Sequence, residues 1–301
     1  MHALASGALR AMLPMKGRIE FVDVAKSYGT GRRARRVVEG CSFTVEPGRC
    51  TVMIGPSGVG KSTIVRLIAG FEKPTSGEVR LDSAPVRRPG PDRLVVFQES
   101  SLFPWMTTGE NILYGPKARG EGDETTLARA EQLLEKVGLQ AFRGKFPTQL
   151  SGGMQRRAEL ARALINDPVV MILDEPFRGL DAMTRMLMLE YYVHLADAAR
   201  RTSLFVTTDI DEAILLADEL LIMSSIPTHV RAAIAVDLPR PRRLADIIDN
   251  ERANDIKIEA LSLLHEEALR SFAAGSRAAA EFVNAYAHRH RSAPTHPLVG
   301  G

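Results

Sequence analysis

The fold is decided by the segment Gly55-Pro56-Ser57-Gly58-Val59-Gly60-Lys61-Ser62-Thr63. The apolar run 51–54 before it predicts a buried strand, and residues 62–69 after it carry apolar side chains at helical spacing. Glycines at these intervals let successive backbone N–H groups point at one anion, beside the positive end of a helix. The sequence therefore predicts a strand, a phosphate-binding loop and a helix, in that order.

The residue types in this segment suit the binding of a polyphosphate and Mg²⁺. We expect all nine residues, from Gly55 to Thr63, to surround the nucleotide phosphates. The Lys61 ammonium would reach the β- and γ-phosphates, which also makes it a catalytic candidate. The Ser62 hydroxyl would coordinate Mg²⁺, a hard cation that prefers oxygen ligands.

The rest of the chain predicts an α/β fold around this loop. Several apolar runs lack polar alternation, as expected of strands covered on both faces of a parallel sheet: residues 94–97, 169–173, 204–206 and 220–223. A small antiparallel sheet is predicted from short strands at 19–24, 36–38 and 41–45, and a helical insert from residues 109–166.

Two adjacent acids follow one of these predicted strands. Asp174 comes directly after the run 169–173, at the carboxyl edge of the sheet, where ligands gather in open α/β folds. We expect Asp174 to bind Mg²⁺. Glu175 projects differently, so it is the expected catalytic base facing a water at the γ-phosphate.

A second candidate anion site is Leu150-Ser151-Gly152-Gly153-Met154-Gln155, with a capping serine, two glycines and a helix start. Together with the phosphate loop and residues 169–175, it gives residues 18–238 a resemblance to ABC transporter ATPase subunits. The resemblance implies a P-loop NTPase fold with a RecA-like parallel-sheet core, a small antiparallel β subdomain and a helical subdomain at about 100–166. It also implies a dimer, in which Ser151, Gly152 and Gly153 contact the ATP held by a second ATPase subunit.

The resemblance implies roles for three more residues. Tyr28 stands where the family has an aromatic ring that stacks on adenine; the alternative is a strand aromatic packed within the small sheet. Gln98 matches the glutamine that senses the metal and the attacking water. Asp181, at the end of the segment 177–181, matches a residue that crosses to the partner's ATP, although the family more often has alanine where Gly179 stands.

The sequence departs from the family at Thr208, where a histidine normally contacts the γ-phosphate. A hydroxyl is shorter and uncharged, so it is a poorer partner for the charge that develops on the transferred phosphoryl group. We therefore expect intact ATP binding but slow hydrolysis. The alternative is that a neighbouring hydroxyl and a water fill the role with little loss.

Residues 89–93, 98–107 and 237–242 resemble the importer branch that handles nitrate, sulfonates and taurine. The resemblance implies transmembrane permease subunits as partners, a solute-binding protein as an indirect one, and a place at the cytoplasmic face of the cell (inner) membrane. Phe103 and Trp105 would lie at the groove where a permease helix docks. The alternative is that they fill the core between two subdomains.

Composition agrees with a peripheral subunit. The 301 residues contain only two cysteines and a net charge of +3, which argues against a disulfide framework and a general nucleic-acid surface. No run approaches the roughly 18 to 20 apolar residues that cross a bilayer. We expect residues 1–17 to be an N-terminal extension and 239–301 a linker, extra C-terminal helices and a disordered tail. One helix is predicted from the apolar spacing of Ile258, Leu261, Leu264 and Ala268, and a second over 272–286. These helices would have a regulatory or dimer-contact role, or serve only as a packing element.

The sequence leaves two alternatives to an importer subunit, which are a nucleotide-sensing subunit and a soluble ABC protein. Thr208 would also suit a catalytically weak, nucleotide-sensing subunit paired with a second ATPase. A soluble ABC protein of DNA repair or the ribosome usually has two fused cassettes or a long coiled-coil insert, and this sequence has neither.

Overall fold

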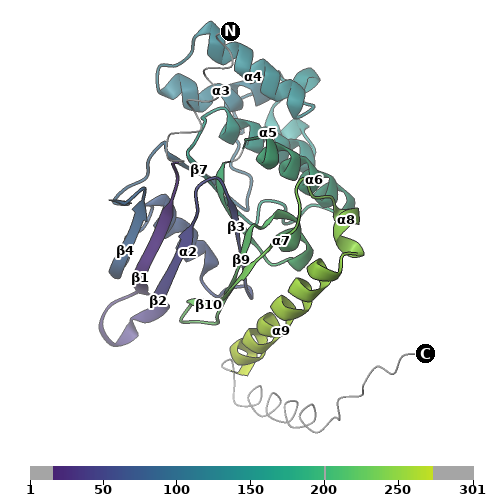
Figure 1. The fold of residues 1–301 in the computed structure, drawn as a ribbon. Helices are drawn as coiled ribbons and strands as arrows, with labels where there is room; N and C mark the ends of the chain where they lie inside the picture. The colour runs from purple at the N-terminus through teal and green to yellow at the C-terminus, as the bar shows by residue number, and fades with distance from the viewer. Residues whose placement is uncertain (1–15, 200, 274–301) are drawn as a thin grey trace, which may run out of the picture.

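The computed structural model describes residues 16–199 and 201–273, which form two β-sheets surrounded by helices (Figure 1). The larger sheet has the strand order β10-β9-β3-β8-β7-β6. Its strands are β3 Cys50–Ile54, β6 Arg93–Val96, β7 Val170–Asp174, β8 Thr202–Thr207, β9 Glu219–Met223 and β10 Val230–Ala235. All neighbours are parallel except β10, which pairs antiparallel with β9 at one edge. The predicted α/β class with a parallel core is confirmed.

The smaller sheet is antiparallel, as predicted. It consists of β1 Ile19–Tyr28, β2 Arg35–Val45, β4 Ser76–Leu81 and β5 Ala84–Pro85. The separate strands expected at 36–38 and 41–45 are wrong, because both belong to β2. The register places Glu39 and Gly40 opposite the single residue Ala25, so a bulge absorbs the extra residue and the strand continues.

The helices fall into a core set, an insert and a C-terminal pair. The core helices are α2 Lys61–Ala69, α6 Ala182–Ala199 and α7 Ile210–Leu216. The insert holds α3 Thr108–Ala118, α4 Glu124–Lys136 and α5 Gly152–Leu164, with a hydrophobic cluster of its own. The C-terminal pair is α8 Leu244–Ile248 and α9 Glu251–Ala273, which confirms the extra helices. Figure 1 shows the insert and α9 at opposite ends of the molecule. Short 3₁₀ turns are η1 Gly31–Arg33, η2 Gln140–Phe142 and η3 Pro147–Gln149.

Both faces of the larger sheet are covered, which explains why its strands show no polar alternation. Along β3, Val52 and Ile54 join one hydrophobic cluster with α6, α7 and α9, whereas Met53 between them joins another with α2 and the small sheet. Every β3 residue is buried. The strand ends that carry the motifs are therefore held by a rigid core on either side.

The side of α9 that faces the core agrees only in part with the face predicted from Ile258, Leu261, Leu264 and Ala268. Leu264 packs partly buried against the core cluster, whereas Ala268 is exposed and Ile258 and Leu261 are 69% and 45% exposed. The buried residues are instead Ala253, Ile256, Ala260 and Glu267, on the side that packs against α7, β9 and β10. Leu263 joins Ile256 and Leu264 on this side, so the packed face combines large apolar side chains with two alanines. The second helix expected over 272–286 lies almost entirely outside the described residues.

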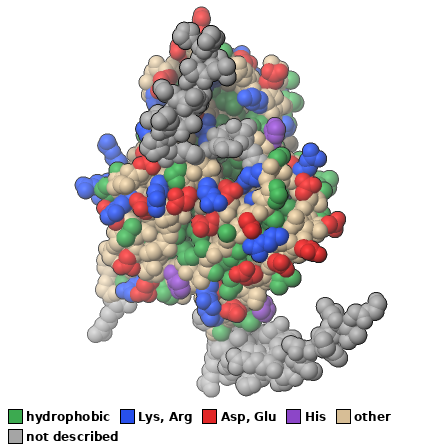
Figure 2. Space-filling model, in the orientation of Figure 1, with side chains coloured by type: hydrophobic (Ala, Val, Ile, Leu, Met, Phe, Trp, Pro, Cys, Tyr) green, Lys and Arg blue, Asp and Glu red, His purple; other side chains and the backbone are tan. Residues whose placement is uncertain are grey.

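The surface carries both signs of charge. On the face shown in Figure 2, Lys and Arg side chains are interspersed with Asp and Glu. Among the helices of residues 16–199 and 201–273, none is long and apolar enough to cross a membrane.

Candidate active site

The predicted site residues follow the carboxyl ends of four neighbouring strands. The phosphate loop follows β3, Thr208 follows β8, Glu175 follows β7, and Gln98 stands two residues beyond β6. Strand pairing places Ile54 beside Thr207 and Asp174 beside Val206, so these ends lie at one edge of the sheet. The structure thus brings together residues that are up to about 150 positions apart in sequence, at the edge where ligands bind in open α/β sheets.

Lys61 lies at the centre of the phosphate loop and is buried, with a 4% exposed side chain. Its ammonium donates to the carbonyl oxygens of Gly55 and Pro56, at 2.7 and 2.9 Å. Burial lowers the pKa of Lys61, while the nearby carboxylates of Glu175 and Asp174 raise it. A buried cation held by neutral carbonyls is well placed to gain from an anionic phosphate.

The shape of the loop requires glycine at position 60, where φ is +111°. A Cβ there would also lie 2.9 Å from Val37 Cγ1 and 3.1 Å from Thr228 Oγ1, so the loop rests directly on β2 and on the chain before β10. Ser57 and Gly58 form the exposed top of the loop, and Val59 is buried beneath it. The start of α2 directly follows, as an anion-binding loop requires.

Ser62 and Asp174 provide oxygen ligands of the kind that Mg²⁺ prefers. Burial raises the pKa of Asp174, and a hydrogen bond from the Ser62 side chain acts against that rise. Asp174 has only 8% of its surface exposed. A buried carboxylate whose ionised form is disfavoured gains from a divalent cation, so these two residues fit Mg²⁺.

Glu175 has an unusual backbone conformation, with φ of +45°. Its N–H donates to the carbonyl of Val206 on β8 at 2.9 Å, and its carboxylate accepts from Arg178 Nη1 at 2.9 Å. Left-handed backbone at a non-glycine residue is strained and is common at functional sites. Sequence reasoning missed Arg178, although its position three residues after Glu175 is the spacing of a local ion pair.

The Gln98 side chain is exposed, and its backbone is fixed by α5. Arg156 donates to the carbonyls of Phe97 and Gln98, at 2.8 and 2.6 Å, and pairs with Glu159. Glu159 in turn accepts from the Ser101 N–H. These supports were not predicted, because Arg156 and Glu159 look like ordinary helix-surface charges in sequence, yet both are buried.

The two threonines at the end of β8 differ in their surroundings. Thr207 is buried, and its hydroxyl donates to Glu212 at 2.6 Å and accepts from the Asp209 N–H at 3.0 Å. Burial raises the pKa of Glu212, which the Thr207 hydroxyl opposes. Thr208 is exposed, and among the described residues no hydrogen bond of its hydroxyl is found. The hydroxyl nearest to Thr208 in sequence is therefore already engaged.

Tyr28 lies at the end of β1 with 37% of its surface exposed. Its hydroxyl donates to Glu72 at 2.6 Å and lies 3.4 Å from Thr63 Oγ1, and the Lys26 ammonium covers its ring at 5.1 Å. The ring thus stands beside the start of α2 and is reachable from solvent. Its role in adenine stacking stays a prediction.

The second anion segment and Asp181 lie side by side. Ser151 caps α5 by accepting from the Met154 N–H at 3.3 Å. An added Cβ on Gly153 would approach Thr184 Cγ2 to 2.6 Å, and Thr184 is the residue whose N–H donates to Asp181 at 3.0 Å. Gly152 similarly lies against Leu180. Ser151, Gly152 and Asp181 are exposed near the starts of α5 and α6, whereas Gly153 is buried against Thr184.

Comparison with known proteins gives consistent matches. Residues 38–178 match the family described as ABC transporter. The chain is 40% identical over 252 residues to the nitrate import ATP-binding protein NrtD of Synechococcus elongatus, covering 83% of this chain and 92% of that protein. It is 40% identical over 249 residues to the bicarbonate transport ATP-binding protein CmpD of the same species, covering 81% and 88%.

Solved structures agree. A dimeric ATP-binding cassette, MJ0796, bound to ADP and phosphate, superposes with a TM-score of 0.65 at 27% identity, covering 73% of this chain and all of that one. The cassette cbiO1 of Clostridium perfringens, at 22% identity and a TM-score of 0.65, shares the fold and covers 82% of this chain and 97% of that one.

Proposed function

This chain belongs to the ABC transporter family as an ATP-hydrolysing subunit, and from that premise we propose that it powers the import of a small solute. Nitrate, bicarbonate and sulfonates or taurine are the candidate solutes. The observation that carries the proposal is the convergence of Lys61, Asp174 and Glu175 at one sheet edge, in a chain similar to NrtD and CmpD. The subunit would lie at the cytoplasmic face of the membrane, bound to permease subunits.

The geometry suggests how each residue would act on ATP. Backbone N–H groups of residues 55–63 and the Lys61 ammonium would hold the phosphates, with Tyr28 against the base. Ser62, Asp174 and Gln98 would hold Mg²⁺, which supplies positive charge next to the phosphate oxygens. Glu175 would accept the proton of the attacking water, and the ion pair with Arg178 at 2.9 Å orients its carboxylate.

A second ATPase subunit would complete the site. The exposed residues Ser151, Gly152 and Asp181 lie at a helix N-terminus, which suits a polyphosphate approached from outside the chain, and the buried Gly153 would contribute through its backbone. The dimeric form of the related cassette MJ0796 supports this arrangement. The purification from membranes described below will show whether the second ATPase subunit is another copy of this chain or a different protein.

The permease would bind a groove next to the glutamine segment. The groove has a volume of about 410 Å³ and is lined by Phe97, Phe103, Tyr114 and Arg162, among others. Phe103 packs between Tyr114 and Trp105, with ring centroids at 4.7 and 5.5 Å, and Trp105 is 69% exposed. Exposed aromatic side chains beside a groove suit a protein contact better than core filling.

Hydrolysis is proposed to be slow because of Thr208. The Thr207 hydroxyl, the nearest substitute, is committed to Glu212 and to the Asp209 N–H. This observation argues against a neighbouring hydroxyl as the replacement. A nucleotide-sensing subunit with weak hydrolysis is the second candidate function, and Thr208 is what favours it.

Purification of the tagged chain from membranes tests the proposal. We expect permease subunits to co-purify, and the reconstituted complex to show ATP-dependent uptake of nitrate, bicarbonate or a sulfonate when the matching solute-binding protein is added. Trp105→Ala should lose the permease while still binding ATP, and Ile258→Ala, on α9 with the same exposed fraction of 69%, should keep it. A different ATPase without permease would support the sensing subunit, and bound nucleic acid or ribosomes would refute both.

A further inference from the structure

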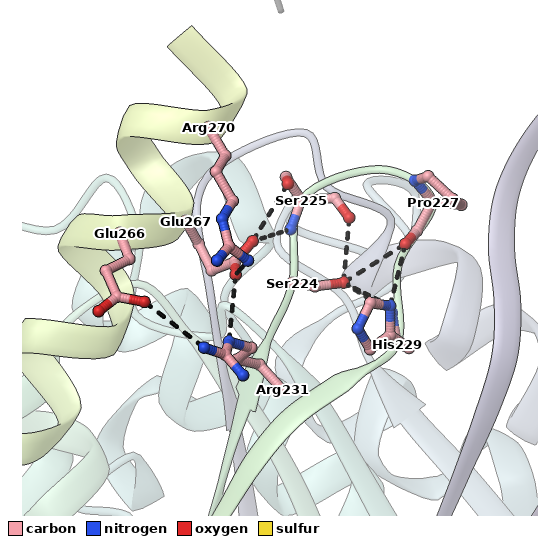
Figure 3. A network of polar contacts seen from close by, with 8 residues as sticks. All are labelled: Ser224, Ser225, Pro227, His229, Arg231, Glu266, Glu267 and Arg270. Atoms are coloured by element: carbon pink, nitrogen blue, oxygen red, sulfur yellow. Dashed lines mark hydrogen bonds and ion pairs between the residues drawn. The ribbon is translucent and has the colours of Figure 1, made fainter. Parts of the chain in front are cut away.

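The C-terminal helix α9 carries a buried carboxylate that the proposed mechanism does not use. Glu267 has no exposed surface, although it lies on a helix at the edge of the molecule. It accepts from the N–H and the hydroxyl of Ser225, at 2.8 and 3.1 Å, and pairs with Arg270 at 2.7 Å and Arg231 at 3.5 Å (Figure 3). A buried charge with this many partners fixes its surroundings strongly.

Ser225 belongs to the loop between β9 and β10, whose other end contacts the phosphate loop. Within this loop, Ser224 Oγ accepts from the His229 N–H at 2.9 Å. Thr228 has no exposed surface, and its hydroxyl donates to the carbonyl of Val59 in the phosphate loop. Glu267 and Val59 are thus connected through one short turn of chain.

The Val59 carbonyl matters because of the peptide group it belongs to. In a planar trans peptide, the carbonyl and the following N–H point in opposite directions. The bond from Thr228 holds the Val59 carbonyl away from the centre of the loop, so it holds the Gly60 N–H toward the centre. The Gly60 N–H is among those expected to bind phosphate.

We propose that Glu267 is a positioning residue for the phosphate loop, through which α9 sets the affinity for ATP. The carboxylate orients the Ser225 turn, the turn places Thr228, and Thr228 fixes the Val59–Gly60 peptide. The strand β2 also holds Thr228, because Thr228 N–H donates to Val37 at 2.7 Å and Glu39 N–H donates to the Thr228 carbonyl at 3.1 Å. The effect of losing Glu267 is therefore a partial weakening of binding.

The first test measures the dissociation constant of Mg-ATP for Glu267→Gln, in the full chain and under conditions without turnover. We expect the dissociation constant to rise by about five-fold or more, the lower end of typical coupling between sites. The matched control is Glu266→Gln on the same helix, whose carboxylate is half exposed and pairs with Arg231 alone among the described residues at 3.5 Å. The control should keep the native affinity.

The second test asks whether the effect runs through Thr228. Thr228→Val removes the donor to Val59, and the double variant should bind ATP no more weakly than Thr228→Val alone. In Glu267→Gln, the rate of ATP hydrolysis at saturating ATP should change much less than the affinity for ATP. The reason is that the Glu267 carboxylate reaches the phosphate loop only through Ser225 and Thr228. Ser225→Ala serves as a second single variant if Glu267→Gln does not fold.

Three results would overturn the proposal. They are an unchanged dissociation constant in both Glu267→Gln and Ser225→Ala, an equal loss in Glu266→Gln, or additive losses in the double variant. Additive losses would mean that Glu267 acts on the site by general loosening and not through the turn. None of these results depends on which solute is imported, so a failure here is separate from a failure of the importer proposal.

Discussion

Replacing Thr208 by histidine is expected to raise the rate of ATP hydrolysis by about 100-fold. Thr208 is exposed at the end of β8, so an imidazole has room there. The neighbouring strand β7 ends at Asp174 and is followed by Glu175, and parallel strands lie about 4.8 Å apart. A histidine side chain spans that gap, so it reaches the region in front of Glu175, where the γ-phosphate is expected.

The magnitude follows from the electrostatic role of such a group. One preorganised donor to charge that develops in the transition state contributes about 10²-fold or more in rate, and each ten-fold equals about 1.4 kcal/mol of activation free energy. The expected gain is therefore about 2.8 kcal/mol. Binding of ATP should be little changed, because the phosphate loop lies on β3 and does not involve Thr208.

Steady-state phosphate release at saturating Mg-ATP measures the effect, with Thr208→Gln as a polar control that cannot become charged. The histidine variant should also gain a pH dependence near the imidazole pKa of about 6.5. The reasoning is refuted if Thr208→His is no faster than the native chain, or if Thr208→Gln is equally fast. If the native hydroxyl already acts with a water, Thr208→Val should fall below the native rate.

Three further predictions follow from the geometry. Burial raises the pKa of Asp174, so the metal-free folded state binds the proton of this carboxyl group more tightly than the unfolded chain does. The free energy of unfolding should therefore fall as the pH rises from the ordinary aspartate pKa through the raised pKa. In urea unfolding, Asp174→Asn should remove this pH dependence, and it should also abolish the Mg²⁺ dependence of ATP binding. Gly179→Ala should lower the free energy of unfolding by about 1 kcal/mol, because φ is +83° while nothing lies within 4 Å of the added Cβ. In a Glu175→Gln background, Gly153→Ala should abolish the ATP-dependent dimer seen by size-exclusion chromatography, because the added Cβ would displace Thr184. The monomer should still bind ATP.

The motifs of this site could be predicted because backbone groups of one continuous segment do much of the binding. The phosphate loop and the pair Asp174–Glu175 each follow directly after an apolar run, so the strand, the loop and the ligand residues are adjacent in the printed sequence. The parallel order of strands then brings those ends together without any further information. Gly179 could be noticed in the sequence for the same reason, because it lies within a continuous motif in which the family more often has alanine. The positive φ at this position explains why glycine is favoured here.

The supports of the site could not be predicted because they come from distant positions. Arg156 and the Gln98 carbonyl are 58 residues apart, and Thr228 and the Val59 carbonyl are 169 apart. Neither pair has a spacing that sequence periodicity detects. The face of α9 was predicted only in part for a related reason, since Ile258 and Leu261 are exposed while Ile256, at another position of the same helix, is fully buried beside the alanines. Apolar spacing within one helix does not tell which of several apolar positions meets the distant strands of the sheet edge.

The burial of Glu267 bears on whether α9 is regulatory or only a packing element. A helix that merely covers the sheet edge is as well served by an apolar residue, because replacing a buried ion pair by a hydrophobic side chain is often neutral or stabilising. Glu267 instead accepts two hydrogen bonds from Ser225, on the loop that also reaches Val59. Whatever binds or moves α9 must therefore act on the same loop, and by reciprocity ATP binding must act on α9. Amide hydrogen exchange of residues 251–273 should accordingly become slower when Mg-ATP binds to the native chain. If exchange slows to the same extent in Glu267→Gln, then Glu267 does not couple α9 to the nucleotide site.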